Sequence, residues 1–117
     1  MTDRKRPLHI LFICSRNQWR SPTAERVIGR WPGVEARSAG TSPRARRSVG
    51  EDDIRWADMV IVMEQKHRQR VVAAFPQLMR QRAIHVLDIP DDYRFMDPEL
   101  VTWIEEAVAP LISGTEA

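Results

Sequence analysis

The sequence predicts an α/β fold in three layers, in which a four-stranded parallel sheet carries helices on both faces. Short continuous apolar runs, typical of strands buried on both sides, alternate along the chain with helix-forming stretches. Strand and helix follow each other four times, which is the order of a parallel sheet with crossover helices. The 117 residues are 43% hydrophobic and 29% charged, so we expect one domain over residues 1–117, with residues 1–7 flexible.

The first strand and helix are predicted between residues 8 and 33. Leu8–Ile13 is an apolar run interrupted by one histidine, which indicates a buried strand. Ser21 followed by Pro22 favours a helix start, with serine as the N-cap and proline at the first helical position. Trp31-Pro32-Gly33 ends this helix. Its apolar stripe has helical spacing and consists of Ala24, Val27, Ile28 and Trp31.

The middle of the chain is predicted to contain two more strands and two helices. Gly40 closes the second strand, and the polar, arginine-rich residues 41–50 that follow read as an exposed loop. Three acids at 51–53 suit the first turn of a short helix, and Phe75-Pro76 ends the next one. The strands are expected at Val34–Ala39 and Met59–Met63, and the helices at 51–57 and Gln65–Ala74.

The last strand and helix are predicted at Ala83–Leu87 and from Pro98 to about Ile112. Asp97 before Pro98 and an acid at 99 form an N-cap and first-turn signature. Ligands bind beyond the carboxyl ends of parallel strands. We therefore look for chemistry in the segments that follow strands one, two and four.

Cysteine and arginine usage narrow the class of protein. Cys14 is the single cysteine, so no intramolecular disulfide can form, a zinc site built from cysteines is excluded, and a cytoplasmic setting is expected. Of the 18 basic residues only Lys5 and Lys66 are lysine, and arginine favours bidentate contacts to oxyanions. No apolar run suits a membrane helix or a secretory signal. No cofactor, metal or membrane partner is expected.

The segment after the first strand carries the chemistry. It runs from Cys14 through six residues to Ser21, and Arg20 lies six positions after the cysteine. A loop that leaves a buried strand and enters a helix N-terminus presents free backbone N–H groups to an anion, and arginine adds a bidentate clamp. The same field favours a thiolate at Cys14, which is then placed for in-line attack on phosphorus and a phosphocysteine intermediate. The alternative is a small buried cysteine at a strand end.

Three stretches of the sequence resemble the low-molecular-weight protein tyrosine phosphatases: Phe12-Ile13-Cys14 through Ser21-Pro22-Thr23-Ala24-Glu25, Ser38-Ala39-Gly40-Thr41, and Ala57 to Met63. The resemblance spans most of the chain. It implies that Cys14 is the nucleophile, that Arg20 clamps the phosphate, and that Ser21 stabilises the leaving thiolate. The phosphate-binding loop then consists of Ser15, Arg16, Asn17, Gln18, Trp19 and Ser21, with Arg16 and Gln18 contributing backbone N–H groups more than side chains.

A proton donor for the leaving group should come from the acidic residues after the fourth strand. Asp97 is better explained as a helix N-cap, and Asp88 lies too close to the strand end. In Ile89-Pro90-Asp91-Asp92-Tyr93 the acid motif of the family aligns with Asp91, with Asp92 in place of its proline. Asp91 is our candidate general acid, and Asp92 is second. A solvated acidic loop is the alternative.

Departures from the family pattern concern the substrate more than the chemistry. Members commonly have a second loop cysteine where Trp19 stands and a glycine where Arg16 stands. The region between Thr41 and Glu51, which forms one wall of the family's cleft, is cut short and filled with arginine. Trp19 is either an aromatic wall of the pocket or packing.

The resulting expectation is a phosphomonoester hydrolase, first of all a protein tyrosine phosphatase, acting on a phosphorylated protein or a small phosphomonoester. One alternative is an arsenate reductase, which without further cysteines depends on an external thiol. Another is a phosphate-binding or nucleic-acid-binding module. Its basic face would consist of Arg44, Arg46, Arg47, Lys66, His67, Arg68 and Arg70. Few aromatics are interleaved with these residues, so nucleic acid is the less favoured partner.

Overall fold

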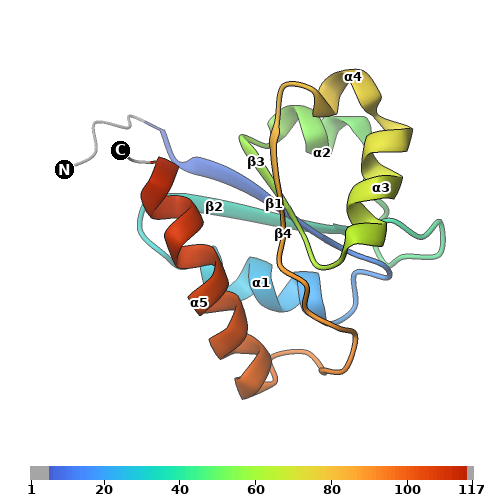
Figure 1. The fold of residues 1–117 in the computed structure, drawn as a ribbon. Coiled ribbons are helices and arrows are strands. Elements are labelled where there is room, and N and C mark those ends of the chain that lie inside the picture. The colour runs from blue at the N-terminus through green and yellow to red at the C-terminus, as the bar shows by residue number, and fades with distance from the viewer. Residues whose placement is uncertain (1–5, 116–117) are drawn as a thin grey trace.

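A computed structural model of the protein describes residues 6–115 (Figure 1). We expected residues 1–7 to be flexible; of these, residues 1–5 lie outside the described residues. Arg6, the first described residue, donates to both carboxylate oxygens of Asp58 at 2.8 Å each. Within residues 6–115, none of the helices combines the length and the apolar character that a membrane crossing requires.

One four-stranded parallel sheet organises the chain, in the order β2-β1-β3-β4. β1 (Leu8–Cys14) lies between β2 (Val34–Gly40) and β3 (Met59–Val62), and β4 (Ala83–Val86) forms the far edge. Cys14 is in register with the last residue of β2. The predicted α/β fold is confirmed, and each strand lies within one residue of its expected bounds.

Helices cover both faces of the sheet (Figure 1). α1 (Arg20–Ile28) and α5 (Pro98–Thr115) pack on one face, where Ile10 and Phe12 of β1 are fully buried. α2 (Glu51–Trp56), α3 (Gln65–Ala74) and α4 (Pro76–Met79) lie on the other face, over Leu11 and Ile13. The alternation of β1 side chains between two apolar layers explains why its sequence is apolar throughout.

Three local features differ from the sequence-based expectation. Ser21 is not the N-cap of α1: the helix begins at Arg20 after Trp19, and the Ser21 hydroxyl points to Cys14 instead. Trp31 lies beyond the end of α1, although it still packs on the core. The short helix α4 was not predicted, because its proline was interpreted only as the end of α3.

The N-cap role of Asp97 is confirmed, since its Oδ1 accepts the N–H of residue 99 at 2.9 Å.

Candidate active site

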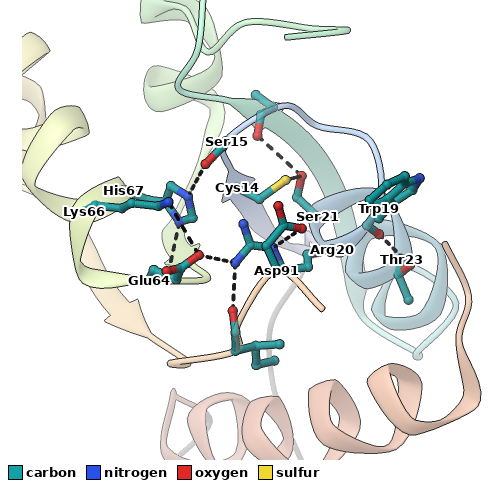
Figure 2. Close-up of polar contacts among 12 residues, drawn as sticks. Cys14, Ser15, Trp19, Arg20, Ser21, Thr23, Glu64, Lys66, His67 and Asp91 are labelled. Atoms are coloured by element: carbon teal, nitrogen blue, oxygen red, sulfur yellow. Dashed lines mark hydrogen bonds and ion pairs between the residues drawn. The ribbon is translucent and has the colours of Figure 1, made fainter. Parts of the chain in front are cut away.

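A small pocket lies at the carboxyl end of β1, where the chain turns into α1 (Figure 2). Its volume is about 160 Å³. The pocket brings together residues from two segments that are about 70 positions apart in sequence. It is lined by Cys14, Arg16, Gln18, Trp19, Arg20 and Asp91.

The loop that forms this pocket is held by its carbonyl groups. Residues 41–46, which follow β2, donate a hydrogen bond to each of four consecutive loop carbonyls. The pairs are Thr41 N to Cys14 O (3.0 Å), Ser42 N to Ser15 O (3.0 Å), Arg46 N to Arg16 O (3.0 Å) and Arg46 Nε to Asn17 O (3.1 Å). With its carbonyls fixed on the side of residues 41–46, the loop is free to present its N–H groups to the pocket. Such an array of N–H groups is an anion site.

Two residues allow the loop to adopt this shape. Asn17 has a φ of 57°, the left-handed conformation that asparagine tolerates better than most residues. Gly40 lies so close to the loop that a Cβ there would be 2.5 Å from the Ser15 carbonyl oxygen and 2.6 Å from the Ala45 Cβ. Only glycine therefore lets β2 and residues 41–46 approach the loop this closely.

A chain of hydrogen bonds orients the hydroxyl group beside Cys14. Glu25 accepts the hydroxyl of Ser38, and the Asn17 amide donates to Ser38 Oγ at 2.9 Å and to Ser21 Oγ at 3.0 Å. Ser21 Oγ lies 3.0 Å from Cys14 Sγ, and the Ala39 carbonyl is farther away, at 3.4 Å. Either Cys14 or Ser21 can donate in this contact while the sulfur carries its proton, but an ionised sulfur can only accept, so Ser21 is then the donor. A sulfur that carries negative charge is stabilised by that hydrogen bond.

Arg20 is 2% exposed and is held on one side only. Its Nη1 donates to Glu64 Oε2 at 2.5 Å and to the Ile89 carbonyl at 2.7 Å. Its Nε is buried and has no hydrogen-bond partner among the described residues. A buried donor without a partner is costly, so this N–H is poised to bind an oxyanion in the pocket.

Glu64 and His67, both after β3, belong to the site but were missed by sequence reasoning. His67 is fully buried; its Nδ1 accepts the Glu64 N–H at 3.0 Å, so its Nε2 carries the proton and donates to Ser15 Oγ at 2.9 Å (Figure 2). Burial, reinforced by the charge of Arg20, lowers the pKa of His67 to about 4. Burial by itself raises the pKa of Glu64, but the hydrogen bond and charge of Arg20 outweigh it and lower that pKa.

The expectation that chemistry lies only after strands one, two and four was therefore incomplete. β3 is hydrogen-bonded to β1, so the segment after β3 reaches the loop directly. A signal was present, because Glu64 and His67 stand at the N-cap and third position of a helix that follows a buried strand.

The structure separates the four acidic candidates after β4. Asp91 lines the pocket, 60% of its side chain is exposed, and its Oδ1 lies 3.6 Å from Arg20 Nε. Asp92 is exposed and does not line the pocket. Asp88 has a φ of 58° and lies in the turn that leaves β4, and Asp97 caps α5.

The remaining predicted loop residues divide between the pocket and its support. Arg16, Gln18 and Trp19 line the pocket, and Trp19 is 39% exposed at its rim. Asn17 is fully buried, and its side chain supports Ser21 rather than facing the pocket. The hydroxyl of Ser15 is bound to His67.

The basic face proposed for nucleic-acid binding is not assembled as expected. His67 is buried and unavailable to a partner. Arg46 donates to the loop, and Arg47 donates to the Ser38 carbonyl and to Asp53. These contacts show that part of the predicted basic face has a structural role.

Comparisons with known proteins find phosphatases that resemble this chain. No protein-family model matches the chain. A curated protein-arginine-phosphatase from Geobacillus stearothermophilus is 30% identical over 95 residues, which cover 61% of this chain. The chain spans 64% of the length of that relative.

Solved structures share the whole fold. The YwlE arginine phosphatase from Geobacillus stearothermophilus is 25% identical, with a TM-score of 0.67 over 92% of this chain and 95% of that chain. The tyrosine phosphatase Wzb from Escherichia coli K30, in complex with phosphate, is 23% identical, with a TM-score of 0.74 over 97% of this chain and 99% of that chain. The chain therefore shares its fold with these phosphatases, and the solved structures that resemble it include low-molecular-weight protein tyrosine phosphatases.

Proposed function

We propose that this protein is a phosphatase that hydrolyses a phosphorylated side chain through a phosphocysteine intermediate on Cys14. The observation that carries the proposal is the pocket itself. A cysteine sulfur within hydrogen-bond reach of Ser21 shares that pocket with Arg20, whose buried Nε has no hydrogen-bond partner among the described residues. Inward N–H groups and a buried guanidinium bind the phosphoryl oxygens, and the sulfur lies behind the phosphorus.

In the first step the Cys14 thiolate attacks phosphorus, and the bond from phosphorus to the leaving group breaks. Asp91, which lines the same pocket, gives its proton to the leaving oxygen or nitrogen. The product is phosphocysteine and the protonated leaving group. Arg20 and the loop N–H groups stabilise the charge on the three equatorial oxygens.

In the second step a water molecule attacks the phosphocysteine and the bond between sulfur and phosphorus breaks. The Asp91 carboxylate, left ionised by the first step, takes a proton from the water. Ser21 donates a hydrogen bond from its hydroxyl to the departing thiolate, because a thiolate can only accept, and the Asn17 amide holds the Ser21 oxygen in place. Inorganic phosphate is released, and both groups return to their starting states.

Phosphotyrosine is the first candidate substrate. Trp19 stands at the rim of the pocket and offers an aromatic face to a phenyl ring. Phosphoarginine is the second candidate, favoured by the likeness to a curated protein-arginine-phosphatase. Gln18 and Asp91 line the same pocket with oxygen acceptors that suit a guanidinium leaving group.

Turnover of an aryl phosphate by the wild type and by Cys14→Ser tests the reaction. We expect turnover in the wild type and its loss in the variant, with inorganic phosphate as a competitive inhibitor. Unchanged turnover in Cys14→Ser would exclude the phosphocysteine route. Parallel assays with free phosphotyrosine and phosphoarginine then rank the two substrates by kcat/KM.

The general acid is tested with leaving groups of different quality. Asp91→Asn should slow hydrolysis of phenyl phosphate far more than that of an activated aryl phosphate, by roughly 10² to 10⁴ in rate. Asp92→Asn is the matched control, since that side chain does not line the pocket. If Asp92→Asn shows the leaving-group dependence and Asp91→Asn does not, the assignment of Asp91 is wrong.

A further inference from the structure

A second and larger concavity adjoins the catalytic pocket. It lies between α1, β2 and the C-terminal end of α2, with a volume of about 890 Å³. Gln18 lines both this concavity and the pocket that contains Cys14, so the two adjoin at that residue. The reaction does not use the concavity, which we call the arginine groove after the four arginines that line it: Arg26, Arg30, Arg37 and Arg46.

The charges of the arginine groove are unbalanced. Its two acids are both engaged: Glu25 accepts from Ser38, and Glu35 lies 3.5 Å from His9 Nε2. Arg26 and Arg30 are exposed on α1, and neither has a carboxylate within ion-pair distance in the described part of the chain. Two unpaired guanidinium groups on one wall favour a ligand that carries carboxylates.

The floor and ends of the arginine groove suit an extended peptide. β2 is an edge strand of the sheet; on its outer side the described residues bond only its end, at Ser38 and Gly40, and Ala36 lies on the groove floor. An edge strand offers backbone donors and acceptors to an added chain. Trp56 stacks on His9 at 4.3 Å between ring centroids, and two of the groove arginines lie over aromatic rings, Arg37 over Trp56 at 4.3 Å and Arg26 over the 43% exposed Phe95 at 6.0 Å. Aromatic and arginine side chains together are enriched at protein interfaces.

We propose that the arginine groove binds an acidic, extended segment of the phosphoprotein substrate next to the phosphorylated residue; the proposal rests on the proposed phosphatase function. With the phosphorylated side chain in the catalytic pocket, the flanking residues pass Gln18 and run along α1. The nine residues of α1 span roughly 14 Å, enough for about four residues of an extended peptide. A small phosphomonoester does not reach this far.

A peptide fits the arginine groove better than a nucleic acid does. Glu25 and Glu35 lie among the four arginines and interrupt the positive charge, which suits a ligand with separated charges better than one with a charge on every repeat. The carboxylates of a peptide can be spaced irregularly. Its backbone N–H groups can also donate hydrogen bonds to the carboxylates of the groove. Acidic side chains thus pair with Arg26 and Arg30 while the backbone of the peptide follows the edge of β2.

The experiment compares charge reversal on the groove with the same change on another helix. The double variant Arg26→Glu/Arg30→Glu alters the groove, and Arg68→Glu/Arg70→Glu is the matched control, because both residues are exposed on α3 and neither lines the groove. The substrates are an aryl phosphate and two phosphotyrosine peptides, one with four flanking glutamates and one with four flanking serines.

For the wild type we expect kcat/KM to be roughly tenfold higher for the acidic peptide than for the serine peptide. Arg26→Glu/Arg30→Glu should abolish this preference and leave turnover of the aryl phosphate unchanged, while the control variant keeps the preference. Equal kcat/KM for the two peptides in the wild type, or an equal loss in both double variants, would overturn the proposal.

Direct binding separates this proposal from the phosphatase function. A fluorescein-labelled, unphosphorylated glutamate-rich peptide should bind the wild type more tightly than Arg26→Glu/Arg30→Glu, measured by fluorescence anisotropy at low salt. If no phosphomonoester is turned over, the phosphatase function fails, but the anisotropy result still decides the docking. Stronger competition by a single-stranded oligonucleotide of equal charge than by unlabelled peptide would assign the groove to nucleic acid and refute a peptide site.

Discussion

Acid should destabilise this protein through His67, a buried histidine that is not itself in the catalytic pocket. Its side chain is fully buried, its Nδ1 accepts the Glu64 N–H, and its Nε2 donates to Ser15. Protonation would place a second donor against the Glu64 N–H and a positive charge near Arg20. Burial and the charge of Arg20 accordingly lower the pKa of His67 from 6.5 to about 4.

The sign and size of the effect follow from this pKa. Between pH 6.5 and 4 the unfolded chain binds a proton at His67 that the folded chain excludes, so stability decreases as the pH falls. The contribution of His67 is complete above pH 6.5 and is lost progressively below it. For pKa values of 6.5 unfolded and about 4 folded, the loss between pH 7 and pH 5 is about 2 kcal/mol.

The assay is urea unfolding at pH 7 and pH 5 for the wild type and for His67→Gln, which cannot titrate. His85→Gln is the control, because that residue is only partly buried on β4. The free energy of unfolding should fall more steeply with acid in the wild type and His85→Gln than in His67→Gln. Equal pH dependence in the wild type and His67→Gln would show that the folded state does not exclude this proton, and the assigned tautomer would be wrong.

Three further predictions concern the loop around Cys14. Gly40→Ala should lower the free energy of unfolding by roughly 1–3 kcal/mol and reduce turnover, since its Cβ would meet the Ser15 carbonyl at 2.5 Å. Gly50→Ala is the control, because its nearest neighbour is Asp53 Oδ2 at 3.9 Å; an equal loss in both would contradict the close-approach explanation. Ser21→Ala should slow the second step by about 10² and cause phosphoenzyme to accumulate after a burst, and steady turnover without a burst would speak against its role. Peroxide should oxidise Cys14, the single cysteine, stepwise to sulfinic acid, which mass spectrometry would detect; complete recovery by a thiol after long exposure would contradict an activated sulfur without a neighbouring thiol.

Local sequence signals were sufficient for the fold. Met59–Val62 and the helix at Gln65–Ala74 could be predicted because apolar runs and helix-ending prolines act over a few residues. The loop from Cys14 to Arg20 could be predicted for the same reason, since strand, loop and helix start are contiguous. The predicted start of α1 was wrong because a serine before a proline can either cap the helix or bind another group. Here the Ser21 hydroxyl lies against Cys14 Sγ and does not cap the helix.

The rest of the site depends on strand order, which no local pattern reveals. Glu64 reaches Arg20 only because β3 is the neighbour of β1, and Asp91 reaches the pocket only because β4 extends the same parallel sheet. Ser38 supports Asn17 from β2 on the other side. These contacts cross 21 to 71 positions of sequence, and they follow from the register of the sheet.

The region directly after β2 gives the loop its orientation. Residues 41–46 follow Gly40 directly and place three backbone N–H groups and one guanidinium against four consecutive loop carbonyls. An anion loop needs its carbonyls held away from the anion, because a carbonyl that faces a phosphate repels it. Here a six-residue segment provides that support, and Gly40 makes its approach possible.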